Sequence, residues 1–236
     1  MRVYAVGDVH GRLDLLRALE TRIAADAAAS PARLEHLIVY LGDYVDRGFE
    51  SRQVIEHLVR EPLEGFNRVC LLGNHDAWLR GFVQGEAVGP AWLQYGGDAT
   101  LLSYGVQIDL RAGEEARLDS ARERLTERLP MEHLAFLEGL ELAFSMGDYF
   151  FCHAGIRPGV PLDEQREQDL IWIREPFLSW TGSAGKVVVH GHTVEEQPVV
   201  LPNRIGIDTG ACWTGRLTCL VLEGSDRRFL STLDPD

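Results

Sequence analysis

The sequence predicts an α/β fold in which parallel strands are covered by helices. Short apolar runs rich in Val, Ile and Leu end abruptly in Gly, Asp, Asn or His, and helix-like stretches separate the first three runs. The 236-residue chain, with 45% hydrophobic and 25% charged residues, has the size and composition of one globular domain. We therefore expect a single domain over residues 1–236, with a helix-rich insertion at about residues 77–140.

Each expected strand is a continuous apolar run, the pattern of a strand covered on both faces. The runs are residues 2–6, 37–41, 69–72, 149–152 and 187–189. Residues 13–28 carry apolar side chains at helical spacing, and residues 51–60 form a second apolar-faced helix that begins at the capping residue Ser51. This alternation of strand and helix over the first 72 residues predicts neighbouring parallel strands.

The middle and the end of the chain have other patterns. Residues 114–129 carry many charges and predict a solvated helix, whereas residues 93–98 and 103–105 are typical of turns. Residues 141–144 and 149–152, joined through Met146-Gly147-Asp148, predict a β-hairpin. Residues 204–208 and 217–222 are expected to be closing strands.

Composition restricts the partners and the compartment. The net charge of −13 argues against broad nucleic-acid binding, which needs a basic face. No apolar run approaches the roughly 18 to 20 residues that cross a bilayer, and no signal peptide precedes the first strand. The four cysteines form no CxxC pair and are expected to be buried thiols in a reducing compartment. We expect a cytoplasmic protein without membrane or nucleic-acid partners; its oligomeric state stays open, with a monomer favoured.

Polar side chains follow the expected strands. Open parallel sheets bind ligands at the carboxyl ends of their strands, so clusters that are distant in sequence can converge there. The clusters are Asp8 with His10, Asp43 with Asp46 and Arg47, Asn74 with His75, His153, and His192. Simpler explanations stay open for single clusters, because Asp8 could be a capping residue and Asp46-Arg47 a structural ion pair.

Taken together, these side chains predict a metal centre. Six of them, Asp8, His10, Asp43, Asn74, His153 and His192, are candidate ligands. Nitrogen and oxygen donors without a thiolate disfavour a closed structural zinc site and suit Mn²⁺, Fe or Zn²⁺. Six ligands are too many for one catalytic metal that also holds water; they suit two metals roughly 3.5 to 4 Å apart that share one carboxylate. We therefore expect two divalent cations per chain, with Mn²⁺ favoured.

The motifs also resemble a known family. Gly7-Asp8-Val9-His10-Gly11, Gly42-Asp43-Tyr44-Val45-Asp46-Arg47-Gly48, Gly73-Asn74-His75-Asp76, His153-Ala154-Gly155 and Gly191-His192-Thr193 occur in this order. They resemble the calcineurin-like metallophosphoesterases and, more narrowly, the bacterial and phage type of the phosphoprotein phosphatase branch. Asp76 and Ala154 depart from the eukaryotic pattern and fit the bacterial one. The resemblance, from Gly7 to about Gly215, implies a four-layer sandwich of two mixed β-sheets flanked by helices.

The resemblance implies a role for each motif residue. Asp8 and His10 would bind the first metal, Asp43 would bridge the pair, and Asn74, His153 and His192 would complete the second site. Asp46 would orient His75, the general acid, while Arg47, Asn74 and Arg174 in the Ile171-Trp172-Ile173-Arg174-Glu175 segment would contact the substrate phosphate. The implied enzyme is a protein serine/threonine phosphatase that hydrolyses phosphoproteins or phosphopeptides with a hydroxide held between the metals. Ile207-Asp208-Thr209-Gly210-Ala211 would be structural.

Two other functions stay open. One is hydrolysis of dinucleoside polyphosphates such as diadenosine tetraphosphate on the same fold; Asp46 argues for the protein phosphatase, because we expect nucleotide enzymes to replace this residue. The other is a non-catalytic scaffold, which is disfavoured because every expected ligand position is filled. Activity on phosphotyrosine also stays open.

Several remaining residues have a structural explanation. His190 is either a partner of the metal ligands or an ordinary strand residue. Cys152 is expected to pack in the core rather than to bind a metal. Trp92 and Tyr95 are expected to be packing residues of the insertion, although both could also line a substrate groove. The other histidines, His36, His57 and His133, are expected to be surface or packing residues.

Overall fold

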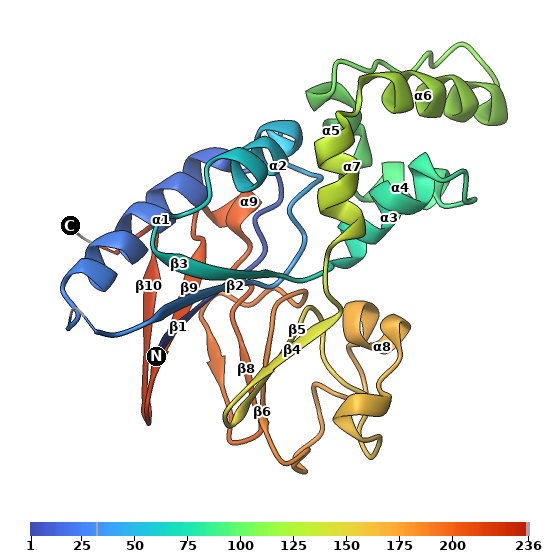
Figure 1. Cartoon of the computed structure of the whole chain (residues 1–236). Coiled ribbons are helices and arrows are strands. Elements are labelled where there is room, and N and C mark those ends of the chain that lie inside the picture. The colour runs from blue at the N-terminus through green and yellow to red at the C-terminus, as the bar shows by residue number, and fades with distance from the viewer. Residues whose placement is uncertain (32, 235–236) are drawn as a thin grey trace.

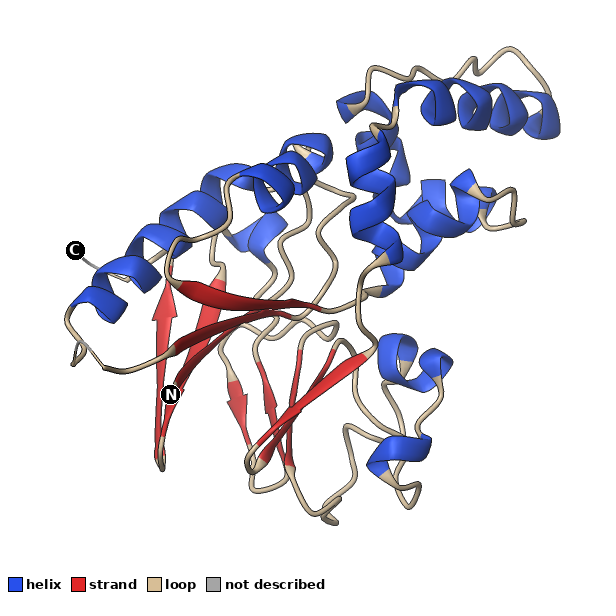
Figure 2. Cartoon of the chain, viewed as in Figure 1, coloured by secondary structure: helices blue, strands red, loops and turns tan. Residues whose placement is uncertain are grey.

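Two five-stranded mixed sheets form the centre of the computed structural model, which describes residues 1–31 and 33–234 (Figures 1 and 2). The first sheet has the order β10-β9-β1-β2-β3 and the second the order β4-β5-β6-β8-β7. The strands of the first sheet are β1 (Arg2–Val6), β2 (His36–Tyr40), β3 (Phe66–Cys70), β9 (Thr218–Glu223) and β10 (Asp226–Ser231). Those of the second are β4 (Ala143–Met146), β5 (Tyr149–Cys152), β6 (Val187–His190), β7 (Val199–Val200) and β8 (Arg204–Gly206).

Each sheet has three neighbouring parallel strands, with antiparallel pairings on one side of them in the first sheet and on both sides in the second. β1, β2 and β3 are parallel, as are β5, β6 and β8. The other pairings, β9 with β1, β10 with β9, β4 with β5 and β7 with β8, are antiparallel. The expected pair of mixed sheets flanked by helices is confirmed, and so is the hairpin of β4 and β5.

Helices cover the outer faces of the sheets. α1 (Leu13–Ala28) and α2 (Ser51–Arg60) pack on the first sheet, in agreement with the sequence prediction, and α8 (Glu167–Trp172) lies beside the second (Figure 1). The helices between β3 and β4 gather beyond the edge of the first sheet. They are α3 (Asn74–Val83), α4 (Gly89–Trp92), the π-helical turn η1 (Leu93–Gly97), α5 (Asp98–Ser103), α6 (Glu114–Arg128) and α7 (Met131–Glu138). The short elements η2 (Leu162–Glu164) and α9 (Ala211–Thr214) precede α8 and β9.

Alternation along the strands creates two cores. In β1, Val3 and Ala5 pack between the sheets, whereas Tyr4 and Val6 pack against the helices. The core between the sheets also contains residues of β2, β5, β6, β8 and β9: Leu37, Val39, Phe151, Val189, Ile205, Leu220 and Leu222. Cys152 belongs to the other core and is fully buried, as expected.

Some expected elements differ in place or character. β3 begins at Phe66 and ends at Cys70, and its central residues Asn67 and Arg68 are exposed because it is the edge strand of its sheet. The expected run at residues 69–72 is buried or half-buried, but only Val69 and Cys70 belong to β3, so the strand lies earlier in the chain than expected. The sequence analysis also missed β7 and β10; β10 contributes mostly exposed charged residues in its first half, so it lacks an apolar run. The turn expected at residues 93–98 is present as a kink at Tyr95 and Gly96, whose backbone angles are not helical and which separates two helical stretches.

Within the described residues, no helix combines the length and the apolarity needed to cross a bilayer. All four cysteines are free thiols; Cys152 and Cys219 are buried, and Cys70 and Cys212 are half-buried.

Candidate metal centre

The candidate ligands converge at the carboxyl ends of strands from both sheets. Asp43 Oδ2 lies 3.5 Å from His10 Nε2 and 3.5 Å from His153 Nε2. His153 Nε2 lies 3.0 Å from Asn74 Oδ1, and the rings of His153 and His192 are 5.1 Å apart. Asp43 is thus central to side chains that follow β1, β2, β3, β5 and β6.

Two buried groups of side chains are compact enough to hold a cation each. They are His10, Asp43 and His75, and Asp43, His153 and His192, with the ligand atoms of each group within 4.8 Å of one another. Two atoms that each lie about 2.1 Å from one cation are roughly 3 to 4 Å apart, so the spacing fits. Both groups contain Asp43, as a shared bridging carboxylate requires.

The protonation of the imidazoles also fits a cation. His153 Nδ1 donates to the Leu41 carbonyl oxygen at 2.9 Å. In the neutral ring, Nε2 therefore carries no proton and has a free lone pair. That lone pair faces the oxygens of Asn74 and Asp43, an arrangement that a positive ion between them would satisfy. Burial lowers the pKa of His153 and keeps the ring neutral. His192 Nε2 is buried without a hydrogen-bond partner among the described residues, so it too has a free position.

Asp43 is held ionised by its surroundings. Burial alone would raise the pKa of its carboxyl, but the four surrounding histidines outweigh burial and lower that pKa. His10 donates from Nδ1 to the Val45 carbonyl oxygen at 2.8 Å, which turns Nε2 toward Asp43. Burial lowers the pKa of His10, so its neutral form is favoured.

Asp8 lies beside these groups and outside both of them. Its carboxylate accepts the backbone N–H of His192 at 3.1 Å and is buried. Its pKa is raised by burial and by the neighbouring carboxylates of Asp208 and Asp43. The resemblance implied that Asp8 would share a metal with His10. In the structure, the compact group around His10 and Asp43 contains His75 instead of Asp8.

Asp208, which the sequence analysis took as structural, lies beside Asp8 and near Asp43. It is buried, its Oδ1 accepts the N–H of Gly210 at 2.9 Å, and its Oδ2 has no partner among the described residues. Burial raises its pKa to about 6. The signal was present in the sequence, because the apolar run before Asp208 ends in Asp just as the runs before Asp8 and Asp43 do.

Backbone strain is concentrated at the same place. In the described chain, the non-glycine residues with positive φ are His10 (46°), Asp43 (53°), Asp46 (73°), Arg47 (67°) and His192 (64°). Such conformations cost about 1 to 3 kcal/mol each and persist only where surrounding contacts enforce them. Each of these residues is a candidate ligand, a candidate phosphate contact or, in the case of Asp46, the partner of the candidate acid His75.

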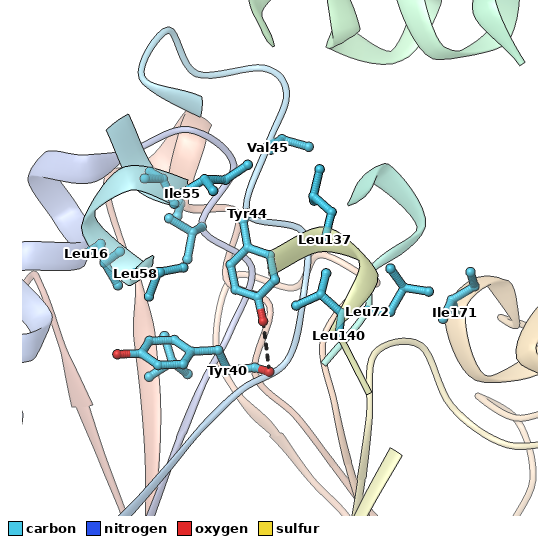
Figure 3. Close-up of a cluster of buried hydrophobic side chains, with 14 of the residues drawn as sticks. Leu16, Tyr40, Tyr44, Val45, Ile55, Leu58, Leu72, Leu137, Leu140 and Ile171 are labelled. Atoms are coloured by element: carbon cyan, nitrogen blue, oxygen red, sulfur yellow. Dashed lines mark hydrogen bonds between the residues drawn. The ribbon is translucent and has the colours of Figure 1, made fainter. Parts of the chain in front are cut away.

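The strained loop after β2 is fixed from two sides. Asp76 Oδ2 accepts the N–H groups of Asp43 at 2.7 Å and Gly73 at 3.0 Å, and Oδ1 accepts that of Tyr44 at 3.0 Å. Tyr44 is buried beneath the loop, where its hydroxyl donates to the Tyr40 carbonyl oxygen at 3.4 Å (Figure 3). Gly73 must lack a side chain because a Cβ there would collide with Asp43.

His75 and Asp46 form a buried pair. His75 Nδ1 lies 2.6 Å from Asp46 Oδ2, and Asp46 is completely buried. Burial lowers the pKa of His75, but the charges of Asp43 and Asp46 outweigh burial, so this pKa is raised. Trp92 Nε1 and Thr100 Oγ1 donate to the Asp46 carboxylate at 2.9 and 2.6 Å. The expectation that Trp92 only packs is therefore incomplete.

Two arginines border the candidate ligands. Arg47 Nη1 lies 2.5 Å from His10 Nε2 and Nη2 lies 3.1 Å from His75 Nε2. Its guanidinium is also 4.7 Å from the centre of the Trp213 ring. Arg174 is exposed, and its charge adds to the effects of burial and of His153 that lower the pKa of His192.

Aromatic side chains lie next to His75 and Arg47. Trp78 stacks on Tyr95 with 5.5 Å between ring centres and touches His75 and Trp172 at 5.3 and 4.6 Å. Tyr95 is 54% exposed, and its stacking on Trp78 fits the expectation that it packs within the insertion. Trp213 is 63% exposed.

The remaining histidines lie outside the two groups. His190 donates from Nδ1 to the Gly191 carbonyl oxygen at 3.0 Å and packs on Phe177, with 5.2 Å between the rings. These contacts favour its interpretation as a strand residue. His57 is buried between Glu20 and Glu61, at 2.6 and 3.0 Å. His133 is buried against Tyr104 and Glu56, and His36 is half-buried.

Comparisons with known proteins agree on the family and divide on the substrate. The sequence profile named Calcineurin-like phosphoesterase matches residues 1–216. The chain is 25% identical to the asymmetrical bis(5'-nucleosyl)-tetraphosphatase PrpE of Bacillus mycoides, covering 93% of this chain and 90% of that protein. It is 28% identical to serine/threonine-protein phosphatase 2 of Escherichia coli (92% and 90% covered) and 26% identical to a symmetrical bis(5'-nucleosyl)-tetraphosphatase of Pseudomonas putida (92% and 88% covered).

Solved structures share the fold. A protein described as a candidate diadenosine tetraphosphatase superposes with a TM-score of 0.67 at 22% identity, over 98% of this chain and 93% of that one. A cold-active protein tyrosine phosphatase superposes with a TM-score of 0.65 at 18% identity, over 97% and 75%.

Proposed function

Because the chain belongs to the calcineurin-like phosphoesterase family, we propose that this phosphoester hydrolase acts on dinucleoside polyphosphates such as diadenosine tetraphosphate. This departs from the sequence-based preference for a phosphoprotein. The observation that carries the proposal is a pair of exposed aromatic side chains beside Arg47: Trp213 lies against its guanidinium, and Tyr95 directly precedes Gly96, whose carbonyl oxygen accepts the Arg47 N–H. Nucleobases stack on such surfaces, and each stack contributes about 1 to 3 kcal/mol. The names of the relatives from Bacillus and Pseudomonas point to the same substrate class.

Two divalent cations would be held in this site. The proposed ligands are Asp8, His10, Asp43, Asn74, His153 and His192, with Asp43 shared, whereas the neighbouring His75 is kept free as the acid. When bound, such a pair lowers the pKa of water to near neutrality and offsets the negative charge of the phosphoryl oxygens. Mn²⁺ is the expected ion, since imidazole, carboxylate and amide ligands suit it, and Fe or Zn²⁺ are the alternatives.

The protein's own residues bind the phosphate chain and manage the leaving group. Arg47 would hold phosphoryl oxygens in forked hydrogen bonds, and the exposed Arg174 beside His192 would hold the next phosphate. In the reaction, a water oxygen bonds to phosphorus and its proton passes to solvent, while the phosphorus–oxygen bond to the leaving nucleotide breaks. His75, held by Asp46, would give a proton to the departing oxygen.

Two substrates test the proposal side by side. With added Mn²⁺, we expect kcat/KM to be about tenfold higher on diadenosine tetraphosphate than on a phosphoserine peptide, because two bases can stack. Trp213→Ala should raise KM for the dinucleotide about tenfold and leave 4-nitrophenyl phosphate unaffected. The matched control is Met131→Ala, an exposed apolar residue at the start of α7. A preference for the phosphopeptide, or equal behaviour of the two variants, would exclude the dinucleotide as substrate.

A second candidate is the phosphoprotein phosphatase. The buried pair of His75 and Asp46 favours it, because the alkoxide of Ser or Thr is a poor leaving group that needs a proton. The similarity to the Escherichia coli protein phosphatase points the same way. The phosphopeptide arm of the experiment above distinguishes the two candidates.

A further inference from the structure

The segment from Trp92 to Thr100 contacts Asp46 and Arg47, two residues with positive φ. Asp46 is the partner of the proposed acid His75, and Arg47 is the proposed phosphate contact. Trp92 Nε1 lies 3.0 and 2.9 Å from the two carboxylate oxygens of Asp46. Thr100 Oγ1 donates to Asp46 Oδ1 at 2.6 Å and accepts the Asp46 N–H at 2.9 Å. The Gly96 carbonyl oxygen accepts the N–H of Arg47 at 3.1 Å. One segment therefore fixes both the backbone and the carboxylate of this turn.

The Trp92 side chain is placed for this contact by its surroundings. It is completely buried, and its ring packs on Phe82 with 4.8 Å between the centres. A Cβ on Gly97 would lie 2.5 Å from the indole ring, so the absence of a side chain there lets the ring cross the backbone. The indole N–H is thereby aimed at a single acceptor group, the Asp46 carboxylate.

Thr100 belongs to a buried polar network. Its hydroxyl lies 2.9 Å from Ser51 Oγ, which also accepts the Asp46 N–H at 3.0 Å. Ser51 and Thr100 are both completely buried. Since buried polar groups are costly when unpaired, removing the Thr100 hydroxyl would release the Asp46 carboxylate to rotate away from His75.

We propose that Trp92 and Thr100 are positioning residues that hold Asp46, and through it His75, in the orientation for proton transfer. The inference rests on the acid role of His75 in the proposed function, but it does not depend on the natural substrate. Hydrogen bonds from Trp92, Thr100 and His75 leave the carboxylate little freedom to turn. Trp92 and Thr100 lie 46 and 54 residues beyond Asp46 in the sequence. The helices between β3 and β4 would therefore supply the hydrogen bonds that hold Asp46 and His75 in place.

Two aryl phosphates with different leaving groups test the proposal. The variants are Trp92→Phe, which keeps the ring and removes the N–H, and Thr100→Val, which removes the hydroxyl. Thr100→Ser keeps the hydroxyl and should rescue. One matched control is Trp180→Phe, a half-buried tryptophan between α8 and β6. The other is Thr126→Val on α6, whose hydroxyl bonds to the Arg122 carbonyl oxygen. Circular dichroism and thermal unfolding identify variants that fail to fold.

The expected result is a selective loss. Each variant should lower kcat on phenyl phosphate about tenfold, with KM unchanged and 4-nitrophenyl phosphate affected less than about twofold. Thr100→Ser and the controls should match the wild type. Equal losses on both substrates, or no loss, would overturn the positioning role. Wild-type activity on the aryl phosphates without activity on diadenosine tetraphosphate would refute the proposed substrate and leave this inference supported by the same variants.

Discussion

His75 connects three parts of the proposed site. Its backbone N–H donates to Asp43 Oδ1 at 2.9 Å, its Nδ1 bonds to Asp46, and its Nε2 faces Arg47. The proposed metal bridge, acid partner and phosphate contact are thus arranged around one residue. A shift of His75 would therefore disturb the proposed metal bridge, acid partner and phosphate contact together.

The raised pKa of His75 predicts a pH dependence. If the protonated ring is the acid, kcat on phenyl phosphate should fall as pH rises through that pKa, so above about pH 6.5. Asp46→Asn removes one of the two carboxylates that raise the pKa, and the fall should move to lower pH. Steady-state kinetics between about pH 5 and 9 measure it. An unchanged profile in Asp46→Asn would remove Asp46 from this role, and His36→Asn is the control.

At the scale of elements, the two helices on the first sheet are joined through a buried acid. Glu20 on α1 accepts from the Tyr40 hydroxyl at 2.5 Å and lies 2.6 Å from His57 Nε2 on α2. α2 begins at Ser51, which accepts the Asp46 N–H. The contact between α1 and α2 therefore influences the position of the loop after β2, which contains Asp43 and Asp46.

This pairing predicts how stability changes with pH. Hydrogen bonds and charge from Glu20, with a smaller contribution from Glu61, raise the pKa of His57 above its unfolded value of about 6.5. The stabilisation is complete below about pH 6.5 and is lost as pH rises through the folded pKa. Urea unfolding near pH 6 and pH 9 should show a larger loss in the wild type than in His57→Gln. The same loss in both proteins would contradict the role of His57; His36→Gln is the control.

At the scale of the whole molecule, the candidate site joins the two sheets. Asp43 and His10 follow strands of the first sheet, whereas His153 and His192 follow strands of the second. A cation held between them would link the sheets on one side of their shared apolar core. Binding only to the folded chain would then stabilise it by mass action.

Thermal unfolding tests this link. At a free Mn²⁺ concentration of about 100 times Kd, the gain is about 2.7 kcal/mol, or a rise in Tm of roughly 5 to 10 °C for a chain of this size. A chelator should reverse the rise. Asp43→Asn should abolish it, whereas Asp98→Asn, an exposed acid at the start of α5, should keep it. An equal rise in Asp43→Asn would show that Mn²⁺ binds elsewhere.

The sequence alone determined the parallel strands, the helices α1 and α2, and the polar residues at the strand ends. It could do so because these features are local. Apolar runs mark buried strands, and the residue after each run lies at the carboxyl end of a strand. The same locality explains the errors. β10 and the edge strand β3 are only partly buried, so their sequences lack the expected pattern.

Only the tertiary structure decided which side chains meet. It grouped His75 with His10 and Asp43, placed Asp208 beside Asp8, and turned Tyr95 outward. It also brought Trp92 and Thr100 to Asp46 from 46 and 54 residues away. Periodicity records how one element is buried, but hydrogen-bond partners from different elements depend on how those elements pack, and no local pattern encodes that packing.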